Sequence, residues 1–348
     1  MDNKRHITFI INPISGTHTK KQLPQLIGET IDAEKFSYDI RCTEYAGHAA
    51  EMARQCAADG VDVVVAIGGD GTVNEVARSL VHSKTALGIV PCGSGNGLAR
   101  HLCIPLDIKK ALGLINRCDI EDFDYGVING LPFFCTCGMG FDAFISLKFA
   151  ESGKRGPISY VENVLKEGLK YRPETYELID ESSTQRHKAF LIACANASQY
   201  GNNAYIAPGA TMKDGLMDVI VMEPFDTLDA PQIAADLFMK TLGNNSKIKT
   251  FRTQSIKIHR DRPGAIHYDG DPIMTDSDVE VHIEHLGIRI IVNPDAPEDK
   301  AQPNQMLNAF SDFFNNINNV RDDIREDIGR SGRRIQAINK LLLRKLRS

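Results

Sequence analysis

One stretch, residues 61–76, constrains the fold of this chain more than any other. It begins with a continuous run of apolar, mostly β-branched residues from Val61 to Ile67. Such a run is typical of a strand that is buried on both faces of a parallel sheet. Gly68-Gly-Asp-Gly71 ends the run, and apolar residues then recur at helical spacing, at Val73, Val76, Ala77 and Leu80. The stretch therefore predicts a strand, a glycine turn and a helix.

The start of this helix predicts a binding site for an anion. Thr72 is expected at the N-cap, and Glu75 three residues later completes a capping-box pattern. Glycines let the backbone approach a ligand without interference from Cβ atoms, and a helix N-terminus attracts negative charge. Three glycines around Asp70 are more than a bare turn needs, so we expect nucleotide phosphates here. The spacing matches neither Gly-x-x-x-x-Gly-Lys-Ser/Thr nor Gly-x-Gly-x-x-Gly.

Composition limits the classes of protein to which the chain can belong. It has 348 residues, of which 42% are hydrophobic and 24% charged, values ordinary for a soluble globular protein of two domains. A net charge of -5 argues against a nucleic-acid partner. No apolar stretch approaches the ~20 residues of a membrane span. We therefore expect a cytoplasmic protein.

The eight cysteines predict a reducing environment rather than a disulfide or zinc framework. No Cys-x-x-Cys pair is present, and most of the cysteines are dispersed and look like buried thiols, Cys42 among them. Cys135 and Cys137 alternate along a strand-like segment, so we expect both to point the same way and to serve packing.

Residues 6 to about 128 alternate between strand and helix patterns, which predicts a doubly wound parallel sheet. The expected strands are 6–12, 38–43, 61–67, 87–90 and 123–128, and the expected helices include 17–30, 48–59 and 107–117. Polar or glycine-rich turns follow the first four strands, notably Asn12-Pro-Ile-Ser-Gly16 and the second glycine-rich loop, Pro91 to Arg100. Because ligands gather at the carboxyl ends of parallel strands, these turns are expected to share one site.

After residue 128 the pattern changes to an antiparallel β domain. Strands are expected over 131–137, 175–179, 189–195, 217–222, 255–259, 264–268 and 279–283, with helices over 141–149, 159–171 and 230–242. The segment 288–292 is more apolar and is expected to return to the first domain. We therefore predict an α/β nucleotide-binding domain over 1–128 with 287–297, a β-rich domain over 129–286, and a linker and tail over 298–348.

The tail has apolar residues at helical spacing from Phe310 to Leu346 and no acid after Asp327. Its final part carries seven basic residues and resembles an interfacial membrane anchor, so an anionic membrane surface is one expected partner. The alternative is a helix that packs on the body or on a second copy of the chain, which would give a homodimer.

Three acid-bearing segments suit phosphoryl transfer, which requires a phosphate cradle, Mg²⁺ and a base. Asp70 lies inside the first glycine turn. Thr211, Asp214 and the Leu216 carbonyl have oxygen spacing suited to Mg²⁺, although a plain hairpin turn would look the same. Tyr268-Asp-Gly-Asp-Pro272 places two further carboxylates around a glycine, and either would suit a general base.

Taken together, these motifs resemble the diacylglycerol kinase catalytic-domain family, which includes bacterial lipid kinases and sphingosine kinases. The resemblance covers about residues 5 to 293. It implies an ATP domain and a β-sandwich lipid domain with a cleft between them. It also implies Mg²⁺ at Thr211, Asp214 and Leu216, and ATP binding by Asn12, Pro13, Ser15, Gly16, Thr43, Gly68, Gly69, Asp70, Gly71, Thr72, Asn74, Gly93, Ser94 and Asn96.

The family's presumed proton acceptor falls at Asp271, where the family usually has Glu, and Asp269 and Asp70 are the alternative bases. The resemblance implies transfer of the γ-phosphoryl group of ATP to the hydroxyl of a lipid such as diacylglycerol. A sphingoid-base kinase, an NAD kinase and a catalytically silent lipid-binding protein are the alternatives. NAD kinases share Gly-Gly-Asp-Gly-Thr, but the loop from Pro91 to Arg100 fits lipid kinases better.

Overall fold

Four parallel strands form the core of the first lobe of the molecule. The computed structural model describes residues 4–15, 22–152, 171–180, 183–226 and 229–296. The parallel strands lie in the order β2-β1-β3-β4. All six residues of β3 are buried, as its continuous apolar run predicts. The bounds are β1 Arg5–Ile11, β2 Phe36–Cys42, β3 Val63–Gly68 and β4 Ala86–Pro91.

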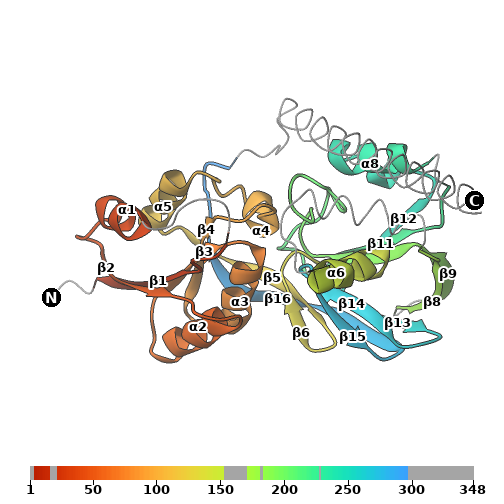
Figure 1. Ribbon diagram of the computed structural model, residues 1–348, viewed down its shortest axis with the longest axis horizontal. Helices are drawn as coiled ribbons and strands as arrows, with labels where there is room; N and C mark the ends of the chain where they lie inside the picture. The colour runs from red at the N-terminus through yellow and green to blue at the C-terminus, as the bar shows by residue number, and fades with distance from the viewer. Residues whose placement is uncertain (1–3, 16–21, 153–170, 181–182, 227–228, 297–348) are drawn as a thin grey trace, which may run out of the picture.

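Helices cover both faces of this parallel sheet. Helices α1 and α5 lie together on one side and α2 and α3 on the other (Figure 1), as in a doubly wound fold. A short helix, α4, follows the loop after β4. The bounds are α1 Leu23–Thr30, α2 His48–Ala58, α3 Asp70–Leu80, α4 Gly97–His101 and α5 Ile108–Arg117.

The second lobe is an antiparallel sandwich of two sheets with a shared apolar core. One sheet has six strands in the order β12-β11-β10-β7-β14-β15. Helix α6 (Phe141–Ser152) packs on its outer face, against β7, β14 and β15. Helix α8 (Ala230–Met239) lies further along the same lobe (Figure 1). The strand bounds are β7 Thr136–Gly140, β10 Leu191–Ala195, β11 Met217–Met222, β12 Ile248–Thr253, β14 Gly264–Tyr268 and β15 Asp271–Thr275.

One long strand, β16 (Asp278–Ile291), joins the two lobes. Its first half pairs with β13 (Ser255–Arg260) in the sandwich, and Ile290 pairs with Leu87 of β4 in the parallel sheet. It also pairs antiparallel with β5 (Ile120–Ile128), with an irregularity between Glu284 and Ile288. The same ten-stranded sheet continues through β6 (Leu131–Phe133), β8 (Glu174–Ile179) and β9 (Thr184–Ala189). This sheet runs through both lobes and so does not separate them at a single point. The domain boundaries at 128 and 286 stay a prediction.

The predicted fold class, a parallel α/β lobe followed by an antiparallel β sandwich, is confirmed. Several details were wrong. Helix α3 begins at Asp70 with Gly69 at its N-cap, so Thr72 lies inside the first turn. Glu75 does not close a capping box, because its Oε1 accepts a hydrogen bond of 3.0 Å from the Gly47 amide of the preceding loop. The predicted segments 279–283 and 288–292 fall on one strand, β16, which ends at Ile291, and the strands β9, β12 and β15 were not predicted.

The cysteines also differ from expectation. All eight are free thiols, but Cys42 is exposed on the edge strand β2. Cys135 packs in the core of the first lobe, whereas Cys137 packs in the sandwich core. The two do not share a face because the predicted strand 131–137 is broken between β6 and β7.

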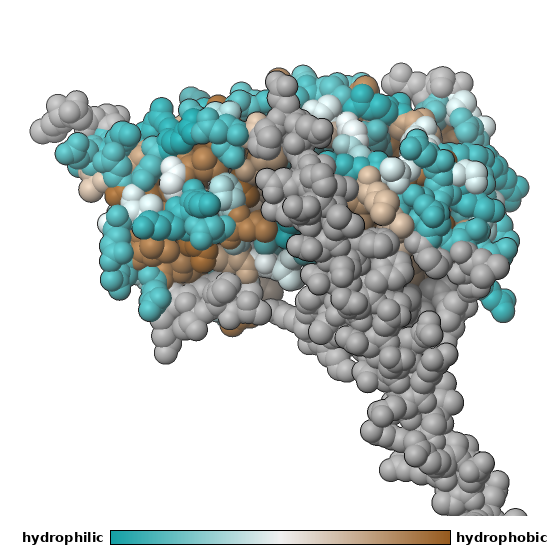
Figure 2. Space-filling model, turned by 90° about the horizontal axis from the view of Figure 1, so that it is seen from above, coloured by the Kyte–Doolittle hydropathy of each residue, from teal (hydrophilic) through white to brown (hydrophobic). Residues whose placement is uncertain are grey.

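The surface differs between the two lobes. Seen from above, the first lobe shows hydrophobic patches among hydrophilic residues, whereas the visible coloured part of the second lobe is mostly hydrophilic (Figure 2). Among the described residues, no helix is long and apolar enough to cross a membrane. The predicted tail, and all but Tyr171 of the predicted helix over 159–171, lie outside the described residues, so the expected membrane and dimer contacts stay predictions.

Candidate active site

The carboxyl ends of the four parallel strands bring the predicted nucleotide residues together. Ile11 is in register with Cys42 on one side and with Ile67 on the other, and Gly68 is in register with Pro91. The turns after these strands therefore meet at one edge of the sheet. These turns, the end of β3 and the first turns of α3 contain all the predicted ATP-binding residues except Gly16, which lies outside the described residues. Among them, Pro13, Ser94 and Gly71 are exposed.

The first glycine turn is tied to the turn after β1. Asn12 Nδ2 donates a hydrogen bond of 3.0 Å to Thr72 Oγ1, and Asn12 Oδ1 accepts one of 3.1 Å from the Ile14 amide. A Cβ atom at Gly68 would lie 2.5 Å from the Thr72 side chain. Close packing therefore favours glycine at position 68, because a larger residue would fit only if Thr72 and the start of α3 moved away.

The two glycine-rich loops touch each other through their backbones. A Cβ at Gly93 would lie 2.6 Å from the Gly69 Cα, and one at Gly95 would lie 2.7 Å from Asp70 Oδ2. Asp70 accepts hydrogen bonds of 2.8 Å from the Asn96 amide and 2.6 Å from the Gly97 amide. Asp70 thus fastens the second loop to the first, and both of its carboxylate oxygens have backbone donors.

Asn96 shapes the second loop. It has a left-handed backbone, φ 51°, at the N-cap of α4, a conformation that asparagine tolerates well. Its Oδ1 accepts from the Gly93 amide at 2.9 Å, and its Nδ2 donates to the Gly93 carbonyl at 2.8 Å. This double contact curls residues 93–96 into a tight cradle beside the first glycine turn.

A segment of the second lobe closes against this cradle. Arg100 Nε donates to the Gly95 carbonyl at 2.9 Å, and another of its nitrogens donates to Asn203 Oδ1 at 3.2 Å. The Asn202 amide donates to the same Gly95 carbonyl at 3.1 Å. Burial lowers the pKa of Arg100 from its ordinary value. Sequence reasoning missed Asn203, because nothing in its local spacing distinguishes it from an ordinary loop residue.

The Asp269-Gly-Asp271 turn brings two carboxylates from the second lobe to the glycine loops. Both Asp269 and Gly270 have positive φ, at 49° and 89°, in the tight turn between β14 and β15. Asp269 accepts hydrogen bonds of 2.9 Å from Asn74 Nδ2 on α3 and of 2.8 to 3.1 Å from the backbone amides of residues 134–136. Burial raises the pKa of Asp269, while these four donors act in the opposite direction.

Asp271 differs from its neighbour in having no such donors. It is open to solvent, and no hydrogen bond to its side chain is present in the part of the chain that the structure describes. Partial desolvation raises the pKa of the Asp271 carboxyl, and the negative charge of Asp269 raises it further, whereas Arg78 on α3 opposes both effects. A raised pKa and free oxygens are the properties of a general base.

Asn74 leaves one acceptor unused at the junction of the lobes. Its Nδ2 is committed to Asp269, and its Oδ1 is buried without a hydrogen-bond donor among the described residues. A buried acceptor without a donor costs about 1–3 kcal/mol. The position therefore fits a water, a cation or a hydroxyl group bound between the lobes.

The predicted magnesium ligands of the second lobe form a turn braced by an ion pair. Asp214 Oδ1 accepts from the Leu216 amide at 3.1 Å, and Asp214 Oδ2 pairs with Arg252. Thr211 lies in the same loop. Among the described residues, no group of three His, Cys, Asp or Glu side chains could hold a metal ion. Asp214 would have to release the Arg252 guanidinium before its Oδ2 could bind Mg²⁺, and the assignment of Thr211, Asp214 and Leu216 as magnesium ligands stays a prediction.

Comparison with known proteins identifies both lobes. The diacylglycerol kinase catalytic domain model matches residues 6–128, and the model of the YegS C-terminal NAD kinase beta sandwich-like domain matches residues 136–292. Together the two models cover most of the chain.

Three curated relatives match about three quarters of the chain each. Lipid kinase YegS from Escherichia coli (strain K12) is 29% identical over 273 residues, 76% of this chain and 89% of that protein. Diacylglycerol kinase from Bacillus subtilis (strain 168) is 25% identical over 269 residues, 76% and 88% of the two chains. The uncharacterized protein sll0036 from Synechocystis is 28% identical over 286 residues, 77% of this chain and 66% of that protein.

Solved structures share the fold. The crystal structure of a diacylglycerol kinase from Bacillus anthracis superimposes with a TM-score of 0.67 at 21% identity, covering 84% of this chain and 99% of that one. At this identity the likeness shows that the two chains have the same fold.

Proposed function

The chain belongs to the diacylglycerol kinase catalytic-domain family, and we propose that it transfers the γ-phosphoryl group of ATP to the hydroxyl of a lipid such as diacylglycerol. Membership makes it a lipid kinase by family. The choice of diacylglycerol as acceptor rests on relatives named for that activity.

One contact supports the proposal above all others. Asn74 belongs to the helix that follows the phosphate turn, and it donates at 2.9 Å to Asp269, which lies 195 residues further along the chain in the second lobe. This bond holds the turn with Asp271 directly against the start of α3. A kinase needs a base and a phosphate cradle at one point, and in this arrangement Asp271 and the glycine loops would supply them.

The geometry favours Asp271 as the base. Asp70 accepts two hydrogen bonds from backbone amides, and Asp269 accepts three from backbone amides and one from Asn74, so the oxygens of both are committed to positioning other groups. Asp271 would accept the proton of the lipid hydroxyl while the oxygen of that hydroxyl attacks the γ-phosphorus of ATP. The bond between that phosphorus and the bridging oxygen then breaks, and ADP leaves with the electron pair.

The glycine loops would hold the phosphates of ATP. Gly69 and Gly93 let the two loops pack backbone against backbone, and the positive end of α3 would favour the charge of the phosphates. Mg²⁺ bound with ATP neutralises phosphate charge in such reactions. The unused Asn74 Oδ1 fits a hard cation, whereas Asp214 would first have to release Arg252.

We also propose that the enzyme works in the cytoplasm at the surface of an anionic membrane, because its lipid acceptor is held in a bilayer. Basic residues near an anionic leaflet contribute about 1 kcal/mol each. The basic end of the tail would supply them, and its truncation after Asp327 should weaken sedimentation with anionic vesicles.

A coupled ADP-release assay tests the proposed function. The purified chain would be offered ATP, Mg²⁺ and, separately, diacylglycerol, a sphingoid base and NAD, and the products would be weighed by mass spectrometry. We expect phosphatidic acid from diacylglycerol, and at least about 10²-fold less of it per unit time from the Asp271→Asn variant. A phosphorylated sphingoid base or NADP as the main product would assign one of the two alternative kinases. No product with any acceptor would favour a silent lipid-binding protein.

A further inference from the structure

A buried carboxylate and histidine lie directly beneath the Asp269-Gly-Asp271 turn and have no part in the reaction described above. Asp142, at the start of α6, contacts His267 on β14, with 3.1 Å between Asp142 Oδ2 and His267 Nε2. Their side chains are only 9% and 3% exposed. A Cβ at Gly138 of β7 would lie 2.6 Å from Asp142 Oδ2 and 3.2 Å from His267 Nε2. Glycine there makes space for the pair.

The other contacts of the pair define the direction of each hydrogen bond. The Gly270 amide can only donate, and it lies 3.4 Å from His267 Nδ1, so Nδ1 accepts. The proton of the neutral ring is therefore on Nε2, which donates to Asp142 Oδ2. Asp142 also accepts from the Tyr200 hydroxyl at 3.3 Å and from the Ala143 amide at 2.7 Å. The ring is thus fixed in one tautomer, with its acceptor aimed at the turn.

The same chain of contacts reaches the nucleotide side of the site. The backbone of Tyr200 packs closely on Gly97, where an added Cβ would lie 3.2 Å from the Tyr200 carbonyl oxygen. The next residue, Gly201, packs on the backbone of Gly95 in the second glycine loop. A continuous path therefore runs from that loop through Tyr200, Asp142 and His267 to the Gly270 amide. It ends one residue before Asp271.

We propose that His267 is a positioning residue of this kinase. Asp142 holds the His267 ring through Nε2. The opposite nitrogen, Nδ1, accepts the hydrogen bond from the Gly270 amide and so orients the turn that presents Asp271 to the lipid hydroxyl. The inference rests on the proposed function for its effect on catalysis, but the effect on the turn can be measured without any substrate. A displacement of a catalytic group by about 1 Å can lower the reaction rate by as much as 10²-fold.

Two conservative variants separate positioning from packing. In His267→Asn, the side-chain Oδ1 can replace Nδ1 as the acceptor for Gly270 but cannot reach Asp142. In His267→Gln, the side-chain amide can reach Asp142 but offers no acceptor at the Nδ1 position. We expect His267→Asn to lose more thermal stability yet keep kcat within about threefold. We expect His267→Gln to be the more stable of the two and to lose kcat at least tenfold, with the KM for ATP unchanged.

The control is His259→Asn, because His259 also pairs with an aspartate, Asp278, at 2.7 Å, but on the exposed surface of β13. It should leave kcat unchanged. If kcat of the two His267 variants instead follows their thermal stability, the pair serves packing alone and the proposal fails.

Amide hydrogen exchange at Gly270 tests the turn independently of activity. We expect exchange to be at least tenfold faster in His267→Gln than in the wild type, and close to wild type in His267→Asn. Equal exchange in all three proteins would overturn the positioning role. If the wild-type chain phosphorylates no lipid while the exchange pattern holds, the proposed function fails and the positioning of the turn stands.

Discussion

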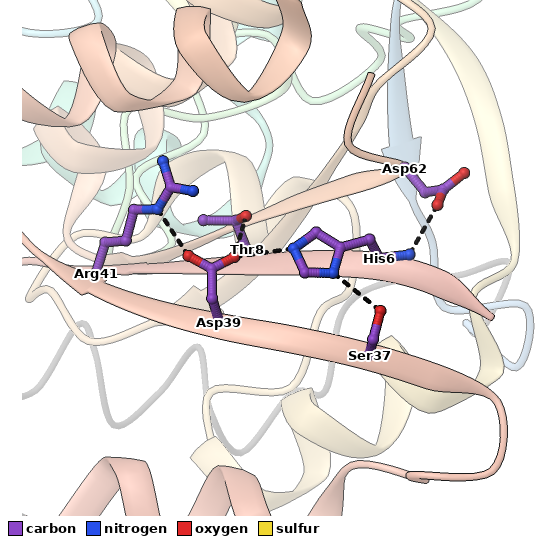
Figure 3. Close-up of polar contacts among 6 residues, drawn as sticks. All are labelled: His6, Thr8, Ser37, Asp39, Arg41 and Asp62. Atoms are coloured by element: carbon purple, nitrogen blue, oxygen red, sulfur yellow. Dashed lines mark hydrogen bonds and ion pairs between the residues drawn. The ribbon is translucent and has the colours of Figure 1, made fainter. Parts of the chain in front are cut away.

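The parallel sheet carries two polar clusters, and they are built in opposite ways. The edge cluster lies along β1 and β2 and consists of His6, Thr8, Asp39 and Arg41 (Figure 3). The junction cluster lies at the carboxyl ends of the strands and consists of Asp70, Asn74, Asn96, Asp269 and Asp271. The edge cluster has the denser array of side-chain ion pairs, yet only the junction cluster has the features of an active site.

In the edge cluster, side chains satisfy one another. Asp39 accepts from Thr8 Oγ1 at 2.7 Å and from Arg41 Nε at 2.7 Å, and it contacts His6 Nε2 at 3.0 Å (Figure 3). Burial acts to raise the pKa of Asp39, but these partners together lower it below its ordinary value. The Asp39 carboxylate is therefore already occupied by its neighbours, and it offers little to a ligand.

In the junction cluster, backbone amides satisfy two carboxylates and leave other groups free. Asp70 and Asp269 are held by the amides of residues 96–97 and 134–136, whereas Asp271 and Asn74 Oδ1 have no donors among the described residues. Close glycine contacts surround these groups. The comparison teaches that the proposed active site is distinguished by polar groups left free beside backbone-held carboxylates, rather than by a high density of charge.

The largest expected effect comes from removing the free carboxylate. Asp271→Asn should lower kcat for lipid phosphorylation by about 10²–10⁴-fold, because the amide cannot accept the proton of the hydroxyl. Steady-state kinetics would measure it, with circular dichroism to show that the fold persists. Turnover within twofold of wild type would return the role of base to Asp269 or Asp70.

The next largest effect should come from the glycine contact between the loops. Gly93→Ala places a Cβ 2.6 Å from the Gly69 Cα, so the cradle must open. We expect kcat/KM for ATP to fall at least tenfold, since small misplacements of bound groups are costly. The matched control is Gly113→Ala in α5, where a Cβ would meet no atom within 4 Å. Equal kinetics of the two variants would contradict the cradle.

A smaller effect should appear in the pH dependence of activity. The Arg78 cation lowers the pKa of Asp271, against burial and Asp269, which raise it. Arg78→Gln should therefore raise that pKa, so that Asp271 becomes protonated at a higher pH. The acidic limb of the profile of kcat/KM should move upward by about half a pH unit, since a partly solvated charge pair contributes ~1 kcal/mol or less. A shift toward lower pH would show that Asp271 is not the titrating base.

The smallest effect is expected at the edge cluster. Asp39→Asn should leave kcat unchanged and lower the free energy of unfolding by about 1 kcal/mol or less, because Asp39 is partly solvated. The pKa of Asp39 is lowered on folding, so its stabilisation is present above the unfolded-state value of about 3.9 and lost as the pH falls through the folded-state value. Urea titrations at pH 7 and in acid should show the difference only at pH 7. A tenfold loss of kcat would make the edge cluster part of the site.

Local sequence determined much of this protein. The apolar run before Gly68 specified a buried parallel strand, and the glycines of both loops predicted the phosphate side of the site. Tyr268-Asp-Gly-Asp-Pro272 specified the acidic turn. The strands missing from the prediction are β9, β12 and β15. All three lie at the edges of their sheets and are largely exposed, and β15 exposes even its apolar residues Ile273 and Met274. They therefore lack the regular alternation of buried apolar and exposed polar residues that identifies a half-buried strand.

Only the tertiary structure decided which acid is free. Asp70, Asp269 and Asp271 look alike in sequence, because each is an aspartate beside a glycine. They differ because the donors to Asp70 lie 26 and 27 residues away, and those to Asp269 lie 133 to 195 residues away, while Asp271 has none among the described residues. The contact between Asp142 and His267 spans 125 residues in the same way. Residue spacing reports neighbours within a turn or a strand, whereas the proton affinity of a carboxylate depends on donors that folding brings from elsewhere in the chain.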